Sequence, residues 1–320
     1  MIIITDCDHG NIDEETQVLK ASGLEFRLEQ CRTEDELIER CAGGEWLLNQ
    51  YARITRRVME ALPEMKFVVR YGVGVDNIDL AAATELGVQV CNVPDYGMNE
   101  VADQALAFFL ALSRKIVLMN NWTKTQKWDY RKSIPVKRTA NMTVGVVGLG
   151  RIGKNFAAKV RALGCKVIGC DINDEVFRDP AIDFVEKASF DDLLKQSDAI
   201  LVFAPLETSR DLFCMAALQK MKSSAFLINT SRGGIVNEAD LDEALRNGTI
   251  VAAASDVMAM EPADTAHPLF QNENFLCTPH MAWYSEESAL ELKRKAAEEA
   301  VSYAKTKTCR YPVNTPTSPR

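Results

Sequence analysis

The sequence lacks an excess of basic residues, and this limits the partners it can have. Its 320 residues include 37 Lys and Arg against 45 Asp and Glu, which gives a formal net charge of −8. Proteins that bind a nucleic-acid backbone or an anionic membrane usually carry an excess of Lys and Arg. We therefore expect no nucleic-acid partner and no membrane partner, and any anionic ligand must meet a local positive site.

The sequence also lacks a CxxC pair. It has nine cysteines, an odd number, at scattered positions: Cys7, Cys31, Cys41, Cys91, Cys165, Cys170, Cys214, Cys277 and Cys309. This scatter is typical of reduced thiols in a cytosolic protein and gives no ligand spacing for structural zinc. We therefore expect a cytoplasmic protein without a metal site.

Long uncharged apolar runs are missing as well. The longest apolar stretch, residues 101–119, contains Asp103, Gln104, Arg114 and Lys115. These residues predict a buried helix rather than a membrane span. The first residues, "MIIITDCDHG", enter a strand-like run without the basic region or cleavage site of a signal peptide. Both observations predict a soluble protein.

What the sequence does have is an alternation of short β-branched runs and helical patterns. The runs lie at residues 2–5, 46–49, 67–70, 88–91, 143–148, 166–170, 199–204, 225–230, 251–257 and 275–279. Such alternation predicts an α/β fold with parallel sheets. A chain of 320 residues is longer than a domain with a single hydrophobic core usually is. We therefore expect two doubly wound domains with a cleft between them.

Two crossing points set the predicted domain boundaries. The Pro- and Gly-containing stretch at 92–100 precedes a long helix expected at about 99–119, and a second crossing precedes a final helix at 285–306. We predict a discontinuous first domain, residues 1–97 plus 285–320, and a second domain, residues 98–284. Residues 311–320 are rich in Pro, Ser and Thr, and we expect a loose tail there.

A glycine-rich turn indicates a dinucleotide site. Gly148, Gly150 and Gly153 form G-x-G-x-x-G directly after a strand run and before a helical pattern. Asp171 ends the next strand run, 23 residues after Gly148, where the fold places the carboxylate that bonds the adenine ribose. Residues 172–174 include no Arg or Lys for a 2′-phosphate, which favours NAD over NADP. The alternative is a tight turn followed by a helix-capping Asp.

Three later segments each place one ionisable residue in a turn after a strand run: Arg232, Glu261 and His280. An acid beside a histidine can hold one imidazole tautomer, so that the ring exchanges a proton with a carbonyl oxygen. A nearby arginine could clamp a carboxylate. Taken singly, Arg232 could cap its turn, Glu261 could be a solvated loop acid and His280 a structural histidine.

The order of these motifs resembles the D-isomer-specific 2-hydroxyacid dehydrogenase family. The matching segments are "RYGVGVDNID" (70–79), "VGLGRIG" (147–153), "NTSRGGIVNE" (229–238), "SDVMAMEP" (255–262) and "TPH" (278–280). The resemblance implies a flavodoxin-like substrate domain and a Rossmann NAD domain, usually in a homodimer, that interconverts 2-oxo acids and D-2-hydroxy acids. It assigns His280 as the acid/base, Glu261 as its partner and Arg232 as the substrate clamp.

The resemblance also implies further ligand contacts. The substrate carboxylate would meet the amides of Val73 and Gly74, and Asp256 would anchor the nicotinamide carboxamide. The remaining cofactor contacts that it implies are Arg151, Ile152, Ala204, Pro205, Thr230 and Ser231. The segment 203–210 departs from the "His-x-Pro-Leu-Thr" pattern of many members, since Phe203 stands at the histidine position.

Two positions are similar to the branch of C-terminal-binding proteins, namely Trp283 after the histidine and Arg70. The resemblance implies that Trp283 forms an apolar or sulfur-tolerant wall of the substrate pocket and that Arg70 is a second positive contact. Alternatively, Trp283 packs between domains. Arg70 could form a salt bridge at a strand end, or it could read a second anionic group on the substrate.

We therefore expect an NAD-dependent oxidoreductase that acts on a small 2-oxo or 2-hydroxy acid. One alternative is an NAD(H)-sensing, corepressor-like interaction protein. Within the family, a 3-phosphoglycerate dehydrogenase or a glyoxylate/hydroxypyruvate reductase also fits. A formate dehydrogenase fits less well, because that relative pairs its histidine with a glutamine where this chain has Glu261.

Overall fold

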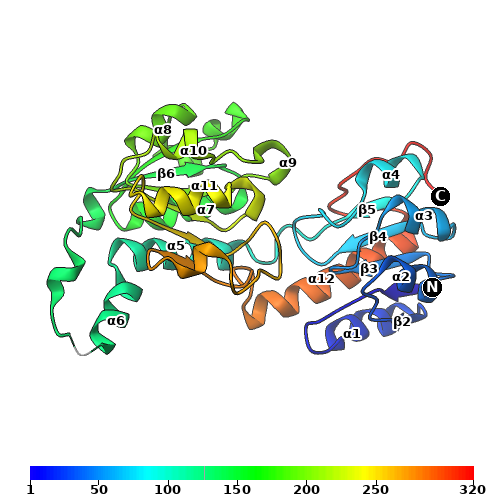
Figure 1. The fold of residues 1–320 in the computed structure, drawn as a ribbon. Coiled ribbons are helices and arrows are strands. Elements are labelled where there is room, and N and C mark those ends of the chain that lie inside the picture. Colours follow the sequence, from blue (N-terminus) through cyan, green and yellow to red (C-terminus); the bar gives the residue numbers. More distant parts are fainter. Residues whose placement is uncertain (126) are drawn as a thin grey trace. The chain divides into compact units, whose positions relative to one another are not determined.

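The computed structural model describes residues 1–125 and 127–320, which divide into two compact units (Figure 1). The first unit comprises Met1–Gly97 and Tyr284–Arg320, and the second comprises Met98–Trp283. The second boundary lies one residue before the one drawn from the sequence. Within the described residues, no helix is long and apolar enough to cross a membrane.

The first unit is built on a five-stranded parallel sheet of order β2-β1-β3-β4-β5. Its strands are β1 (Ile2–Ile4), β2 (Phe26–Leu28), β3 (Trp46–Asn49), β4 (Phe67–Arg70) and β5 (Gln89–Cys91). The helices are α1 (Asp13–Ser22), α2 (Glu34–Arg40), α3 (Arg56–Ala61), α4 (Leu80–Glu85) and α12 (Glu286–Thr306). The side chains of β1 are fully buried, as expected for a central parallel strand.

Helix α12 joins the first unit although it comes from the far end of the chain. It packs against α1, β3 and β4. The ring of Tyr303 stacks on Phe67 of β4 at 4.4 Å between centroids. The helix begins at a Ser285 capping box, in which Ser285 and Ser288 exchange hydrogen bonds.

The C-terminal segment is not the loose tail that its composition predicts. It lies antiparallel to β5. Val313 N donates to the Val90 carbonyl at 2.9 Å, and the backbones of Cys91 and Pro312 form an antiparallel β-bridge. The Asn314 carboxamide accepts from Val90 N at 2.7 Å. Pro and Ser/Thr content therefore gave the wrong expectation, because hydrogen bonds to an otherwise open sheet edge order this segment.

The second unit holds a seven-stranded parallel sheet of order β12-β11-β10-β9-β6-β7-β8. The strands are β6 (Thr143–Val147), β7 (Lys166–Cys170), β8 (Glu186–Lys187), β9 (Ala199–Val202), β10 (Phe226–Asn229), β11 (Ala252–Ser255) and β12 (Phe275–Cys277). The order reverses between β6 and β9. In doubly wound sheets a dinucleotide binds at this switch point, outside the carboxyl ends of the strands.

Helices cover both faces of this sheet (Figure 1). The helices are α5 (Met98–Ser113), α6 (Ile116–Lys124), α7 (Arg151–Ala162), α8 (Phe190–Gln196), α9 (Leu206–Ser209), α10 (Met215–Leu218) and α11 (Glu238–Arg246). Phe109 of α5 and Phe156 of α7 belong to one apolar cluster. Leu193 of α8, Leu218 of α10 and Leu241 of α11 belong to another, so each face has its own core.

The long helix expected at 99–119 is two helices. Helix α5 ends at Ser113, and α6 begins at Ile116 after Lys115, whose φ of 52° lies in the left-handed region. A lysine there breaks the helix as a C-terminal cap would. The sequence also gave no signal for the short strands β2 and β8, which lie at sheet edges and are half-buried or exposed.

Candidate active site

The glycine-rich turn joins β6 to α7 and needs two of its glycines for its own packing. Gly148 has φ +88°, and a Cβ on it would lie 2.7 Å from the Phe203 carbonyl oxygen. A Cβ on Gly153 would lie 2.0 Å from the Gly148 carbonyl oxygen. Gly150 caps α7, and a Cβ there would meet nothing within 4 Å. Packing does not demand glycine at 150, whereas the close approach of a pyrophosphate would.

Asp171 lies directly beside this turn. One carboxylate oxygen accepts from Leu149 N at 2.7 Å, and the other accepts from Asn173 N at 2.8 Å. These bonds fix the carboxylate between the turn and the end of β7. Each oxygen can still accept another hydrogen bond. Asp171 could therefore bond the adenine ribose while it keeps its bonds to the two backbone N–H groups.

The turn after β10 carries two residues expected on the nicotinamide side. Ser231 Oγ donates to the Val202 carbonyl at 2.7 Å, and Ser231 N donates to Asn229 Oδ1 at 3.0 Å. Within the described residues, the buried hydroxyl of Thr230 has no hydrogen-bond partner. A buried hydroxyl in this state usually has a ligand or a water as partner. The glycine turn, Asp171 and Thr230 together fit a dinucleotide.

His280 and Glu261 form the expected pair. His280 Nδ1 lies 2.6 Å from Glu261 Oε2, and Glu261 Oε1 accepts from Met258 N at 2.8 Å. Because Glu261 occupies Nδ1, the Nε2 atom on the opposite side of the ring can serve a ligand. The His280 side chain is 39% exposed, which keeps it accessible. This geometry fits the acid/base role that the resemblance implies.

The backbone of His280 is held in an unusual conformation. Its φ of 51° is left-handed, which is uncommon for a residue other than glycine, and its N–H donates to the Asp256 carbonyl at 2.7 Å. The Asp256 carboxylate accepts from Thr278 Oγ1 at 2.5 Å, Met281 N at 3.0 Å and Ala282 N at 2.9 Å. Asp256 therefore fixes the turn that carries His280. Burial raises the pKa of Asp256 and outweighs these three hydrogen bonds.

Glu261 stays ionised beside the histidine. Burial works to raise the pKa of Glu261, but the hydrogen bond and charge of His280, the Met258 amide and the charge of Arg232 outweigh it and lower the pKa. Arg232 therefore belongs to the same electrostatic group as the pair. A Cβ on Gly233 would lie 2.0 Å from the Met258 backbone, so the Arg232 segment is packed directly against the segment that leads to Glu261.

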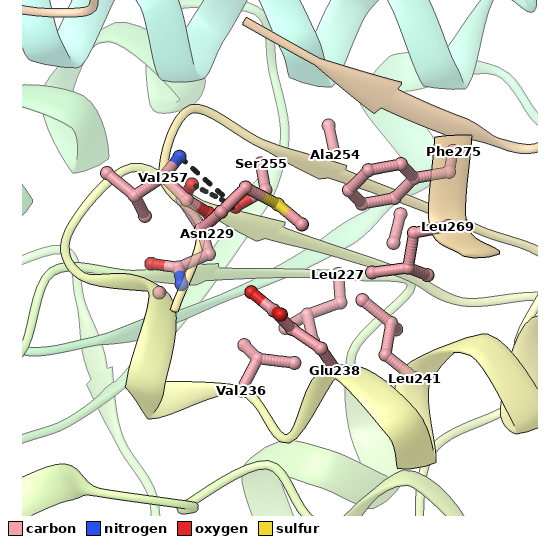
Figure 2. Close-up of a pocket in the computed structure, with 13 residues that line it drawn as sticks. Leu227, Asn229, Val236, Glu238, Leu241, Ala254, Ser255, Val257, Leu269 and Phe275 are labelled. Atoms are coloured by element: carbon pink, nitrogen blue, oxygen red, sulfur yellow. Dashed lines mark hydrogen bonds between the residues drawn. The ribbon is translucent and has the colours of Figure 1, made fainter. Parts of the chain in front are cut away.

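A small cavity lies behind this group, lined by the ends of β10 and β11 and by α11 (Figure 2). Its lining is mostly apolar, and its acidic residue, Glu238, is already paired. The Glu238 carboxylate accepts from Ala259 N at 2.6 Å and lies 3.2 Å from His267 Nε2. Glu238 thus fastens the loop that carries Glu261, and the cavity is a packing gap beneath that loop.

Asn229, Glu238 and Thr278 support the site and had no predicted role. Asn229 Nδ2 donates to the Arg232 carbonyl at 2.8 Å, which fixes the arginine turn. Each of the three stands inside a motif quoted from the sequence: Asn229 directly before Thr230, Thr278 two residues before His280, and Glu238 at the end of its motif. A polar residue at a buried strand end was the signal available for Asn229 and Thr278.

The segment that departs from the family pattern uses Phe203 for packing. Its ring lies 5.4 Å from the Phe156 ring of α7. Ala204 and Pro205 follow, and α9 begins after Pro205. The aromatic ring therefore helps to seat α7, and the cofactor contacts of Ala204 and Pro205 stay predictions.

Arg70, Val73 and Gly74 belong to the first unit, at the turn after β4. Arg70 Nε donates to the Gln50 carbonyl at 3.3 Å, and a Cβ on Gly72 would lie 1.9 Å from the guanidinium. The arginine thus lies over the turn that contains Val73 and Gly74. The Val73 carbonyl accepts from Asn92 Nδ2 at 2.6 Å, which fixes the turn further. Trp283 is half-buried and is the last residue of the second unit.

Comparison with known proteins identifies the family. The family described as D-isomer specific 2-hydroxyacid dehydrogenase, NAD binding domain, matches residues 106–282, which is more than half of the chain. The chain belongs to this family, and its second unit contains the family's NAD-binding domain.

Individual relatives point the same way. The chain is 34% identical over 308 residues to a D-3-phosphoglycerate dehydrogenase of Archaeoglobus fulgidus, covering 95% of this chain and 58% of that protein. It is 34% identical over 264 residues to a glycerate dehydrogenase of Methylorubrum extorquens, covering 80% and 81%. The crystal structure of the TT0316 protein from Thermus thermophilus is 28% identical with a TM-score of 0.87, covering 98% and 99%. The chain thus spans little more than half the length of the first of these.

Proposed function

We propose that this protein is an NAD-dependent D-2-hydroxyacid dehydrogenase that interconverts a small 2-oxo acid and the corresponding D-2-hydroxy acid. The contact of 2.6 Å between His280 Nδ1 and Glu261 Oε2 is the observation that carries this proposal. It supplies an oriented acid/base whose Nε2 can reach a ligand. Arg232 adds the positive charge that a carboxylate substrate needs.

The proposed residues divide the reaction between them. Bound NADH supplies the hydride that reduces C2 of the 2-oxo acid. The Arg232 guanidinium binds the carboxylate and polarises the neighbouring carbonyl, together with the amides of Val73 and Gly74. His280 Nε2 donates its proton to the carbonyl oxygen, which becomes the hydroxyl of the product, while Glu261 stabilises the imidazolium before transfer. In the oxidative direction His280 takes that proton back.

The cofactor contacts form the second part of this proposal. Gly148, Gly150, Arg151, Ile152 and Gly153 would surround the pyrophosphate, where the first amides of α7 face the anion. Asp171 would bond the adenine ribose. Thr230, Ser231 and Asp256 would line the nicotinamide end, and Ala204 with Pro205 the coenzyme loop.

The substrate is proposed at the level of its class. The names of the relatives, 3-phosphoglycerate and glycerate dehydrogenases, suggest three-carbon acids. Arg70 over the 72–74 turn favours acids with a second anionic group, such as 3-phosphohydroxypyruvate or 3-sulfopyruvate. If Trp283 forms the pocket wall instead, acids with apolar or thioether side chains are favoured, such as 4-methylthio-2-oxobutyrate.

NADH oxidation against a panel of 2-oxo acids tests the proposal. The panel contains glyoxylate, pyruvate, hydroxypyruvate, phenylpyruvate and the three acids named above. We expect turnover of at least one, and His280→Ala should lower kcat by roughly 10²–10⁴-fold with NADH binding retained. Turnover that survives in His280→Ala would refute the acid/base assignment. NADH binding without any turnover across the panel would favour the NAD(H)-sensing interaction protein.

We also propose a cytoplasmic homodimer formed through the second unit. The segment that contains α6 and the 3-10 helix at Tyr130–Ser133 exposes several large apolar side chains: Ile116, Trp128, Tyr130 and Ile134. An exposed apolar group of this kind usually marks a protein interface. Sedimentation should give a dimer for the native chain and a monomer for Trp128→Glu. Leu290→Glu, at an exposed leucine of α12, is the control that should stay dimeric.

A further inference from the structure

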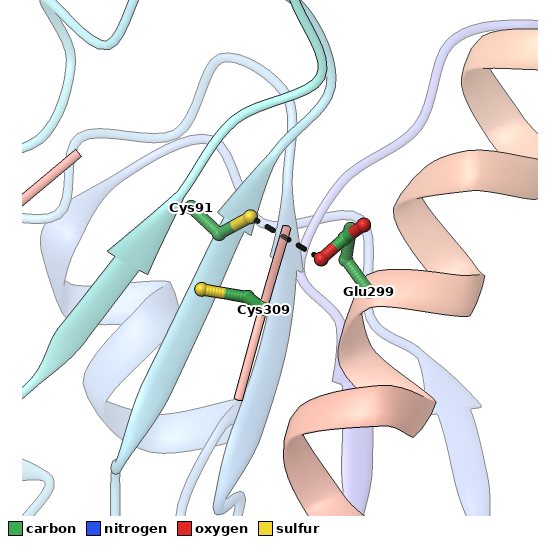
Figure 3. Close-up of side chains that lie close together, drawn as sticks. All are labelled: Cys91, Glu299 and Cys309. Carbon is green, nitrogen blue, oxygen red and sulfur yellow. Dashed lines mark hydrogen bonds between the residues drawn. The ribbon is translucent and has the colours of Figure 1, made fainter. Parts of the chain in front are cut away.

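Two cysteines and one glutamate that are far apart in the sequence meet inside the first unit (Figure 3). Cys91 ends β5, Glu299 lies on α12, and Cys309 follows that helix in the C-terminal segment. Their sulfur and oxygen atoms all lie within 4.8 Å of one another. Within the described residues this is the one group of three such side chains close enough to share a metal ion.

The spacing of the three donor atoms suits a tetrahedral ion. Zn–S bonds of about 2.3 Å and Zn–O bonds of about 2.0–2.2 Å place neighbouring ligand atoms roughly 3.5–3.8 Å apart. The Cys91 Sγ to Glu299 Oε2 distance is 3.7 Å. The other separations among the three atoms are at most 4.8 Å, so each would have to shorten by about 1 Å or less to reach this range. The three side chains therefore need little rearrangement to bind one ion.

The burial of the group suits a bound ion as well. Cys91 and Glu299 are buried, whereas Cys309 is half-buried. An ion would enter from the more open side, where Cys309 lies. Water from that side would complete the coordination.

The surrounding charge completes this arrangement. Arg310 N donates to Glu299 Oε2 at 2.8 Å, and its guanidinium Nε lies 3.5 Å from Glu299 Oε1. Two thiolates, one carboxylate, one arginine and one divalent cation sum to zero charge. Neutrality matters here because an uncompensated charge in a buried site is costly.

We propose that Cys91, Cys309 and Glu299 form a binding site for one thiophilic divalent cation of the Zn²⁺ type, with water as the fourth ligand. Two thiolates select such an ion over Mg²⁺ or Ca²⁺, which prefer oxygen ligands. The absence of a CxxC pair led to the expectation of no metal site. That reasoning cannot detect ligands supplied by a strand, a helix and a terminal segment far apart in the chain.

The bound ion would fasten the C-terminal segment to the sheet. Cys309 precedes the residues that pair with β5, and Cys91 lies on β5 itself, so the ion would cross-link both ends of this contact. Asn92, which holds the Val73 carbonyl, is the next residue after Cys91. Metal binding would therefore stabilise the first unit next to the 72–74 turn.

Titration of the reduced, metal-free full chain with Co²⁺ tests this site directly. Tetrahedral Co²⁺ bound to thiolates gives sulfur-to-metal charge-transfer absorption and intense visible bands. We expect both, saturating at one ion per chain, and displacement of Co²⁺ by Zn²⁺ should remove them. A folded, reduced chain that shows no thiolate absorption with excess Co²⁺ would overturn the proposal. This readout requires neither NADH nor substrate, so it is independent of the proposed enzymatic function.

Matched variants identify the ligands. Cys309→Ser changes a half-buried side chain and should weaken Co²⁺ binding by more than roughly 100-fold, since even residues that only hydrogen-bond a ligand contribute about 10–100-fold. Glu299→Gln should weaken it by roughly 10–100-fold. Cys214→Ser, at a half-buried cysteine of the second unit, is the control and should bind as the native chain does. Unchanged binding by Cys309→Ser would overturn the assignment.

The two thiols could instead pair with each other. Loss of two electrons and two protons to an added oxidant would join them as a disulfide, detected as a loss of two hydrogens in the intact mass. If this disulfide forms under air even with saturating Zn²⁺ present, the pair is a redox couple and the metal-site proposal fails. Protection of both thiols from oxidation by Zn²⁺, but not by Mg²⁺, supports it.

Discussion

Asp171 shows how one residue can satisfy both interpretations of a motif. Its carboxylate accepts two backbone N–H groups, from Leu149 and Asn173, as a purely structural acid would. The same bonds place it beside the glycine turn, where a ribose would lie. The structural contacts therefore pre-organise the carboxylate for the cofactor, and its unused acceptor positions are available to a ribose hydroxyl.

Asp171→Ala should weaken NADH binding by roughly 10–100-fold, because a hydrogen bond to a charged group contributes about 1.5–3 kcal/mol. NADPH should be affected less, since its phosphate no longer meets a like charge. Fluorescence titration with each cofactor measures both constants. An unchanged ratio between the two cofactors would remove Asp171 from the ribose site.

Glu261→Gln removes the charge at the acid/base pair. Its single amide oxygen can still accept from His280 Nδ1, but only by giving up the contact with Met258 N, and it no longer stabilises the imidazolium, so kcat for reduction should fall by roughly 10²-fold. The alkaline limb of its pH–rate profile should move to lower pH. A profile that keeps its shape would show that the glutamate charge is irrelevant to proton transfer.

The same residue links stability to pH. The pKa of Glu261 is lowered on folding, so its ionised form contributes stability above the ordinary glutamate pKa. This contribution is lost as the pH falls through the lowered value. Denaturation of the native chain and of Glu261→Gln at several pH values should show a difference that shrinks in acid.

Among the elements, the strands buried in the middle of each sheet were predictable, and the edges were not. Runs such as residues 2–4 and 199–204 are apolar throughout because helices cover both faces. Strands β2 and β8 have no such run, and the break between α5 and α6 depends on the left-handed Lys115 rather than on a glycine or proline. Periodicity alone does not signal features that tertiary contacts decide.

The C-terminal segment illustrates the same limit and gives a test. Asn314 accepts from Val90 N and Gln89 Nε2 and donates to the Val88 carbonyl and Thr84 Oγ1. Asn314→Ala should lower the free energy of unfolding of the first unit by about 1–3 kcal/mol, because partly buried groups lose their partners. Denaturant melts with a chelator present measure this. Thr315→Ala, at the exposed neighbour, should change it by less than about 0.5 kcal/mol.

For the whole molecule, the sequence motifs pointed to the candidate site residues. The hydrogen bonds that hold these residues in place join different motifs, and only the structure reveals them. The order of Gly148, Arg232, Glu261 and His280 along the chain could be recognised without a structure. The contacts of Asp256 with the turn after β12, and of Glu238 with the Glu261 loop, could not, because they join segments whose spacing carries no signal. Family resemblance therefore proposed the site residues, and the structure shows which contacts hold them in place.

The proposed ligand contacts are divided between the two units, and this division can be measured. All the cofactor contacts lie in Met98–Trp283, whereas Arg70, Val73 and Gly74 lie in the first unit. At 100 times its Kd, NADH should stabilise the unit it binds by about 2.7 kcal/mol. Amides of β6 and β10 that exchange only on unfolding of that unit should then exchange roughly 100-fold more slowly.

Hydrogen exchange read by mass spectrometry should therefore separate the two ligands. NADH alone is expected to protect the second unit and to leave the 72–74 turn unchanged. Adding a slowly reacting 2-oxo acid should extend protection to that turn, because its carboxylate would bind the amides of Val73 and Gly74. Equal protection of both units by NADH alone would contradict this division of contacts. Protection of the turn by the acid without NADH would show that the first unit binds substrate on its own.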